Sequence, residues 1–467
     1  MALQTAAVPI IANKGRPPRR QRRSRPAQND IMAMRMPAFA PQAVPDLVIR
    51  LEWGKRSKGS VMSPDFPRYP KLRDLQPTPA SQQGQQLLLL HDPLQLAEKS
   101  VLLPAELAPL LRLIDGSRDI PDLRRALRLG FGLDLAEAEL RRWIQELDVA
   151  CLLENSRSAL AMEQRLEAYR CAPSRPPVLA GDVYPQDPDQ LRDFLGQAMM
   201  EAEAPASAGP FRGLISPHID YARGAAVYAS TWSAAAVSLQ EADLLIILGT
   251  DHYGEDELIT LTRQHYETPL GILPTDEEAL QVLVGAIGEA EAFRGELRHR
   301  TEHSIELAAI WAQFLRDQDP LPILPILCGP VANLVGEASR PFVHRALGPL
   351  LQGLRTLLNT RRALIVTAAD LSHVGQAFGD APIDPVAKAE VQQADERLLA
   401  CIQDGDARRL LNEIVSCEDR NHVCGATPIS LTLMALAPVR GRIVRHEFCP
   451  ADRAGKSWVT VCGALLE

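Results

Sequence analysis

Three short segments place histidine or aspartate directly after apolar runs that suit buried strands. They are Ser216-Pro217-His218, Gly249-Thr250-Asp251-His252 and Ala369-Asp370-Leu371-Ser372-His373. In open α/β sheets, ligands bind outside the carboxyl ends of the strands. A single histidine at such a place is usually a satisfied surface or core group. Three at equivalent strand ends therefore indicate a shared site.

Two further segments carry groups of the same kind. Glu302-His303-Ser304-Ile305-Glu306 opens a predicted helix and can present a carboxylate and an imidazole to the same crevice, although plain helix capping is the simpler interpretation. Asn421-His422-Val423-Cys424-Gly425 precedes another helical run, where the helix dipole favours a thiolate. Cys328 and Cys462 lie inside apolar strand candidates, so we expect buried core thiols there.

The elements that must position these residues alternate in type. The apolar runs FRGLISP, ADLLIILG, LPILPILCG and RRALIVTAAD suit buried strands, and DEEALQVLVGAIGEA and SIELAAIWAQFLRD have helical spacing. This alternation predicts an α/β fold in which a central sheet is flanked by helices.

Composition bounds the class of protein. The 467 residues are 46% hydrophobic and 23% charged, with a formal net charge of −8, which is typical of a globular protein and argues against a general nucleic-acid binder. No apolar run approaches the roughly 20 residues of a membrane span, and the start lacks the apolar core of a secretory signal. Eight scattered cysteines without a CxxC pair favour reduced thiols. We expect a cytoplasmic protein with no membrane association and no specific nucleic-acid partner.

The chain divides into four predicted stretches. Residues 1–85, with a basic arm between Arg19 and Arg25, lack periodicity and are expected to be a disordered basic and proline-rich tail. Residues 86–155 carry leucines at helical intervals that predict three amphipathic helices. Residues 156–180, with APSRPP, are predicted as a linker because paired prolines stop helices, and residues 181–467 hold the α/β domain.

Two resemblances follow from these patterns. The sequence pattern of residues 86–155 resembles the PqqD-like winged-helix modules that bind peptide precursors. This resemblance implies that the segment docks a peptide or protein and has no catalytic chemistry of its own. Further on, the ordered blocks SPHIDYARGAAVYA, ILGTDHYG, ETPLGILPTDEEAL, EHSIEL, LPILPILCG, TAADLSH and CGATPISLTLMAL resemble the Memo family. Its bacterial members are called AmmeMemoRadiSam system protein B.

The Memo resemblance implies a fold related to the LigB-type extradiol dioxygenases, with a metal pocket at the strand ends. Carried over by motif, the metal ligands are His218, His252 and Cys424. His303, Asp370 and His373 would line the same pocket as supporting or acid–base groups and are our catalytic candidates. The chain departs from the family where Tyr253 follows His252 and in its closing strand, which affects fine substrate geometry more than the fold.

Two imidazoles and a thiolate favour iron(II), with copper or zinc possible. The resemblance thus implies a non-haem iron or copper redox protein with dioxygenase-related activity, acting with a radical-SAM enzyme and an AMMECR-type protein. This chain lacks a CxxxCxxC motif, so a partner would supply any radical chemistry. The alternatives are a non-catalytic peptide or protein-binding module on the same fold, and a structural zinc site, which normally needs four protein ligands.

Overall fold

The computed structural model describes residues 48–50, 66–82, 85–96, 100–202, 210–317, 319–335 and 345–467. Most of the predicted basic tail therefore lies outside the described residues. None of the helices in these ranges combines the length and apolarity needed to cross a bilayer.

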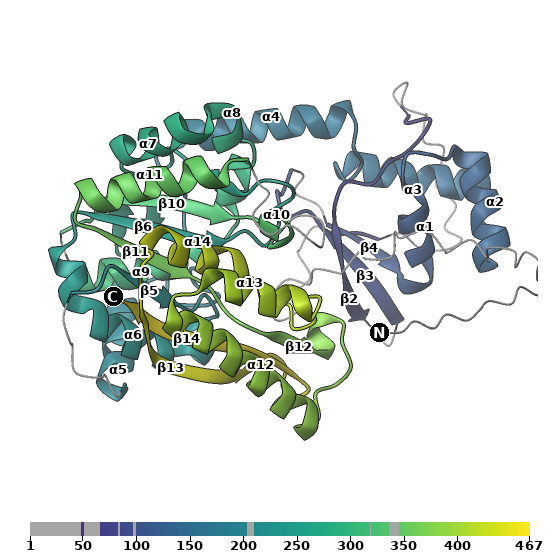
Figure 1. Cartoon of the computed structure of the whole chain (residues 1–467). Helices are drawn as coiled ribbons and strands as arrows, with labels where there is room; N and C mark the ends of the chain where they lie inside the picture. The colour runs from purple at the N-terminus through teal and green to yellow at the C-terminus, as the bar shows by residue number, and fades with distance from the viewer. Residues whose placement is uncertain are drawn as a thin grey trace, which may run out of the picture. The chain divides into compact units, whose positions relative to one another are not determined.

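An N-terminal unit combines a small sheet with the three predicted helices (Figure 1). Its strands lie in the order β1-β4-β3-β2, with β1 parallel to β4 and the other pairs antiparallel. Their bounds are β1 Val48–Arg50, β2 Gln76–Gln82, β3 Gln85–His91 and β4 Ser100–Pro104. A 3-10 turn, η1 Ala105–Leu107, leads into helices α1 Ala108–Leu113, α2 Ile120–Phe131 and α3 Glu137–Val149.

The sheet is the part of this unit that the leucine spacing did not predict. β1 and β2 lie wholly before residue 86, inside the expected tail, and the leucine run that starts at Leu87 is a strand. Its side chains alternate, because Leu90 joins the core under the helices while Leu87 and Leu89 pack on the other face with Leu102. A short apolar run cannot be assigned to strand or helix by periodicity alone.

The stretch expected as a linker is mostly a helix, α4 Ser156–Cys171. The side-chain oxygen of Asn155 caps it by accepting from the main-chain N–H of Ser158. In turn, the hydroxyl oxygen of Ser158 accepts from the main-chain N–H of Asn155. The paired prolines, Pro176 and Pro177, come only after this helix has ended. The linker prediction therefore gave the prolines too much weight and missed the cap.

The larger unit is built on an eight-stranded mixed sheet with the order β12-β14-β5-β11-β6-β10-β7, in which β13 also pairs with β14. The four predicted apolar runs are its four parallel strands: β5 Gly213–Ser216, β6 Leu244–Thr250, β10 Ile323–Cys328 and β11 Ala363–Ala368. Antiparallel strands extend both sides: β7 Ile259–Leu261, β12 His373–Gly375, β13 Gly441–Pro450 and β14 Ser457–Leu466. A separate hairpin pairs β8 Tyr266–Thr268 with β9 Gly271–Leu273.

Helices cover both faces of this sheet, which confirms the predicted α/β class (Figure 1). Alternate residues of β6 serve the two cores, Ile246 and Leu248 on one side and Leu245 and Ile247 on the other. The first core is covered by α7 Glu277–Ile287, α11 Leu347–Thr360, α12 Pro385–Asp404, α13 Ala407–Ser416 and α14 Ala426–Leu436. The second is covered by α5 Pro188–Glu201, α6 Tyr221–Glu241 and α9 Ser304–Arg316. Short turns complete the unit: α8 Glu289–Ala292, α10 Ala332–Val335, η2 Glu296–Arg300 and η3 Gln376–Phe378.

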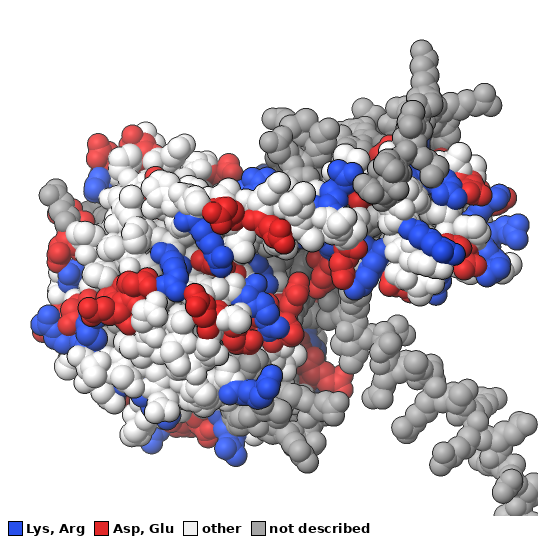
Figure 2. Space-filling view, turned by 90° about the horizontal axis from the view of Figure 1, so that it is seen from above, with Lys and Arg blue, Asp and Glu red and all other residues white. Residues whose placement is uncertain are grey.

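Acidic and basic side chains are interspersed over the face shown in Figure 2. Among the described residues of that face, neither sign of charge forms a continuous field.

Candidate metal centre

The parallel strands bring the predicted residues to one edge of the sheet. His218 follows β5, Asp370 follows β11 and His252 follows β6, and β11 lies between the other two strands. All three strands run parallel, so their carboxyl ends meet at the same edge. The side chains after them therefore share one site, as expected for open α/β sheets.

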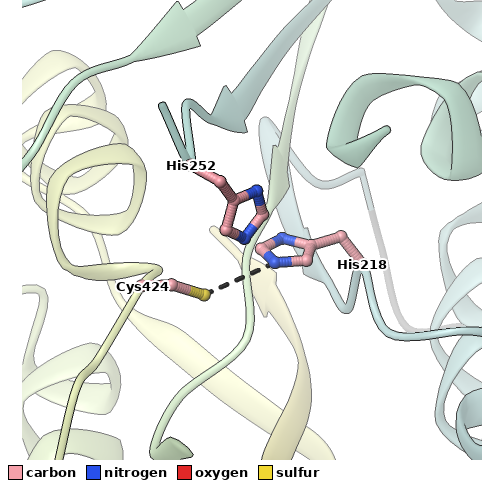
Figure 3. Close-up of side chains that lie close together, drawn as sticks. All are labelled: His218, His252 and Cys424. Carbon is pink, nitrogen blue, oxygen red and sulfur yellow. Dashed lines mark hydrogen bonds between the residues drawn. The ribbon is translucent and has the colours of Figure 1, made fainter. Parts of the chain in front are cut away.

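Cys424 reaches the same place from the loop before α14. Its Sγ lies 3.4 Å from Nε2 of His218, and the donor atoms of His218, His252 and Cys424 all lie within 4.8 Å of one another. Figure 3 shows the three side chains pointing toward one another from three separate segments. His218 is fully buried and the other two are partly exposed. The predicted ligand set is thus brought together.

Gly425 allows this close approach. A Cβ at this position would collide with the main-chain oxygen of Asp370 and would lie 2.7 Å from Cβ of Ala369. The same Asp370 oxygen accepts from the main-chain N–H of Gly425 at 3.0 Å. The loop that carries Cys424 is therefore pinned directly to the loop that follows β11.

Each histidine has one ring nitrogen committed outside the centre. Nδ1 of His218 donates to the main-chain oxygen of Ala368 at 3.0 Å, and Nδ1 of His252 lies 3.1 Å from both carboxylate oxygens of Glu302. Nε2 of both rings is then left for the centre. Nε2 of His252 is buried and makes no hydrogen bond to any residue in the described part of the chain. A buried nitrogen without a partner fits a metal ligand, because burying an unsatisfied polar atom is otherwise costly.

Glu302 supports His252 from behind. Its buried carboxylate also accepts from the main-chain N–H groups of His252 at 3.0 Å, His303 at 2.7 Å and Ser304 at 3.1 Å. Burial alone would raise the pKa of Glu302, but His252 and these hydrogen bonds hold it well below its usual range. Through these hydrogen bonds Glu302 fixes the orientation of His252.

The thiol and the imidazole at the centre stabilise each other's charged forms. Burial would raise the pKa of the Cys424 thiol, but His218 and His373 lower it to about 5. Burial would lower the pKa of His218, but Asp370 and Cys424 raise it to about 9. At neutral pH a thiolate therefore faces an imidazolium, and a bound cation would take the place of the proton.

The three catalytic candidates lie around this centre. Asp370 accepts from the main-chain N–H of His218 at 2.9 Å, and the ring of His303 stacks on that of His252 with centroids 4.9 Å apart. Nδ1 of His373 lies 3.2 Å from the main-chain oxygen of Leu371, while its Nε2 is buried without a hydrogen bond to any described residue. Their positions match the expectation, and their roles stay predictions.

Two further groups complete the surroundings and were absent from the predicted set. Arg298 donates to Asp251, beside His252, at 2.7 Å, and the fully buried Arg175 contacts the segment that carries Glu302. Neither residue stands in a strand-end pattern. For Arg175 the only local signal is its place immediately before Pro176 and Pro177, in the stretch predicted as a linker.

Comparison with known proteins gives a consistent family. A family model described as Memo-like protein matches residues 175–459, which include all three proposed ligands. A MEMO1 family protein of Aquifex aeolicus is 28% identical over 313 residues, covering 67% of this chain and 77% of the relative. One of Thermus thermophilus is 26% identical over 331 residues, covering 71% and 94%. One of Methanosarcina barkeri is 33% identical over 178 residues, covering 36% and 63%.

Proposed function

Since the chain belongs to the Memo-like protein family, we propose that it is a metal-binding protein whose centre is held by His218, His252 and Cys424. The observation that carries the proposal is the buried, unpartnered Nε2 of His252 facing a thiolate and a second imidazole. Without a cation, one ligand is left unsatisfied and the other two form an internal ion pair. A metal ion accounts for all three groups at once.

The donor set selects the kind of metal. A thiolate is softer than a carboxylate, so iron(II) is our first assignment, with copper or zinc as the other candidates. Structural zinc sites normally close with four protein ligands. Among the described residues, the donors that converge on this centre are two imidazoles and one thiolate, which would leave coordination positions of a metal open. We therefore propose a redox centre of the non-haem type with dioxygenase-related activity.

Iron(II) or copper at this place supplies electron transfer and the activation of dioxygen or of a bound substrate. The chain's own residues then control protons and charge. Glu302 and the main-chain oxygen of Ala368 keep the Nδ1 proton on His252 and His218, so that both Nε2 lone pairs face the centre. His373, whose Nε2 has no partner among the described residues, is our candidate to exchange a proton with substrate.

His303 and Asp370 take supporting roles in this proposal. Burial lowers the pKa of His303 well below its usual range, so its ring is neutral where it stacks on His252. Asp370 balances the positive charge of the centre through His218. On the ground of the family resemblance we further propose a radical-SAM enzyme and an AMMECR-type protein as partners. Any radical chemistry would come from such a partner, because this chain has no CxxxCxxC motif.

A second candidate is a non-catalytic module that binds a peptide or protein. The observation that favours it lies at the end of α2, where Leu129 is 75% exposed and Phe131 is 48% exposed. Large apolar side chains at the surface of a small unit often mark a contact with a partner. In this case the metal centre stabilises the fold or the partner contact and has no turnover.

Oxygen uptake separates the two candidates. The protein is loaded anaerobically with iron(II), mixed with ascorbate and oxygenated buffer, and compared with His373→Gln at equal iron content. Oxygen uptake that is faster than that of free iron(II) at the same concentration, and that falls at least tenfold in His373→Gln, supports a redox enzyme. Iron that is bound in stoichiometric amount but consumes no oxygen in either protein supports the binding module.

A further inference from the structure

The guanidinium of Arg175 is fully buried although it belongs to the segment between α4 and α5 that was predicted as a linker. Nε donates to the main-chain oxygen of His299 at 2.9 Å, a terminal nitrogen donates to the main-chain oxygen of Glu302, and the other terminal nitrogen pairs with the carboxylate of Glu306. The guanidinium carbon lies over the ring of Tyr266, 4.9 Å from the ring centroid. Three edges of the group and one face are thus occupied.

Glu306, in the first turn of α9, binds both Arg175 and the main chain that follows it. Besides Arg175, its carboxylate accepts from the main-chain N–H groups of Val178 at 2.8 Å and Leu179 at 3.0 Å, and from the hydroxyl of Tyr184. The segment from 175 to 184 is therefore folded around the first turn of α9. A buried ion pair with all its hydrogen bonds made holds a single geometry, whereas removal of one partner leaves a buried charge.

The segment held by Arg175 leads directly to a metal ligand. Arg175 binds the main-chain oxygens of His299 and Glu302. The ring of His299 is held on both sides, because its Nδ1 lies 2.7 Å from the hydroxyl of Tyr266 and its Nε2 lies 2.9 Å from the main-chain oxygen of Thr260. The side chain of Glu302 then reaches from this fixed backbone to both the main-chain N–H and Nδ1 of His252. A shift of the backbone at Glu302 would turn the ring of His252.

We propose that Arg175 is a positioning residue of the metal centre, which acts through Glu302 on the orientation of His252. The inference rests on the proposed function, since it assumes that Nε2 of His252 binds a metal. Lysine cannot substitute at this place, because an ammonium lacks the planar fork that reaches two carbonyl oxygens and a carboxylate together. Groups that orient a metal-binding histidine typically change metal affinity by about 10- to 100-fold when lost.

The test compares Arg175→Lys with the full-length wild type and with Arg361→Lys as a matched control. Arg361 is likewise an ion-paired arginine, 3.2 Å from Asp243, but it is only partly buried and lies next to the opposite ends of β6 and β11. Cobalt(II) is titrated anaerobically into each protein, and the thiolate-to-cobalt absorption and the dissociation constant are measured. Circular dichroism and the unfolding midpoint are recorded on the same samples to separate folding from binding.

We expect Arg175→Lys to weaken cobalt binding at least tenfold with a changed absorption spectrum, while Arg361→Lys stays within about twofold of wild type. A folded Arg175→Lys protein with wild-type affinity and spectrum would overturn the inference. If Arg175→Lys does not fold, Glu306→Gln takes its place, because it removes the ion pair that holds the guanidinium of Arg175 in reach of the oxygens of His299 and Glu302. Wild-type affinity and spectrum in Glu306→Gln would then overturn it.

A second readout does not depend on any metal. In the metal-free protein, NMR of ¹⁵N-labelled histidine reports the hydrogen bond from Nδ1–H of His252 to Glu302 through the chemical shift of that proton. We expect the same shift in wild type and in Arg361→Lys, and a changed shift or faster exchange of this proton in Arg175→Lys. If wild type binds no cobalt at Cys424, the proposed function fails. An unchanged Nδ1–H signal of His252 in folded Arg175→Lys counts against the positioning role whether or not cobalt binds.

Discussion

The chemistry available to each cysteine depends on its neighbours more than on its own burial. Cys328 and Cys462 lie inside strands, as their apolar surroundings predicted, and burial raises the pKa of both thiols. Cys424 has histidines on two sides, which reverse the effect of burial on its pKa. The sequence signalled this difference through the polar turn around Cys424, but the identity of the neighbouring histidines required the fold.

This difference predicts the reactivity of the metal-free protein. Below the pKa of about 5 the Cys424 thiolate is lost, so alkylation by iodoacetamide should fall as the pH drops through that value. At pH 6 we expect Cys424 to react roughly ten times faster than the exposed Cys171, whose pKa is raised by Glu167. Mass spectrometry of peptides from chelator-treated protein measures both rates. Equal rates at pH 6, or faster reaction at Cys171, would contradict this.

At the scale of elements, the site depends on how closely α9 approaches β6. Gly249, near the end of β6, faces Ser304 and Ile305 at the start of α9. A Cβ at Gly249 would lie 2.5 Å from Oγ of Ser304 and 2.6 Å from Cγ1 of Ile305. The helix start that follows Glu302 is therefore packed against the strand that leads to His252.

Gly249→Ala should push these two elements apart and lower the free energy of unfolding by about 1–3 kcal/mol. Gly285→Ala is the control, because Gly285 lies in α7 and a methyl group added there would meet nothing within 4 Å, so alanine should stabilise by about 0.5–1 kcal/mol. Urea denaturation gives both values. A Gly249→Ala protein as stable as wild type would contradict this, because it would show that α9 can move away from β6 without a loss of unfolding free energy.

The turn η2 carries a histidine that folding keeps neutral. Burial lowers the pKa of His299 to about 3, well below that of a free histidine near 6.5. Stability from this group is therefore complete above pH 6.5 and is lost as the pH falls toward 3, since the unfolded chain binds a proton that the folded chain does not.

His299→Gln should remove this pH dependence, because glutamine can still donate to Thr260 and accept from Tyr266. Between pH 6 and pH 4 the slope of unfolding free energy against pH should fall by about 1.4 kcal/mol per pH unit relative to wild type. Urea denaturation at several pH values measures the slope. An unchanged slope would mean that His299 titrates alike in the folded and unfolded chain.

At the scale of the whole molecule, the sequence predicted what depends on local pattern. The four parallel strands and the groups after three of them could be read from apolar runs followed by polar residues. Arg175 could not be assigned from pattern, because its role arises from contacts with residues more than a hundred positions away. Glu302 was expected at the crevice, but the fold was needed to show that it binds His252. The helix α4 was missed because the prolines after it were given more weight than the Asn155 cap.

The position of α4 predicts where the metal-binding unit begins. The hydroxyl of Tyr169 lies 3.1 Å from that of Thr262, and Arg170 pairs with Glu296 at 2.6 Å, so this helix belongs with the larger unit. A fragment of residues 156–467 should keep the metal content of the full chain. A fragment of residues 177–467 lacks Arg175 and should lose most of it. Elemental analysis of both fragments decides, and equal metal content in the two would contradict the boundary.

The account rests on a metal held by His218, His252 and Cys424, and metal content tests it most directly. The full chain is purified without oxygen, and its metal content is measured by elemental analysis. The variants His218→Ala, His252→Ala and Cys424→Ser are measured in the same way, with Cys171→Ser as a control thiol. We predict close to one iron or copper per chain in wild type and Cys171→Ser, and loss from the other three. Wild type without metal, or metal that stays in all three ligand variants, would contradict the account.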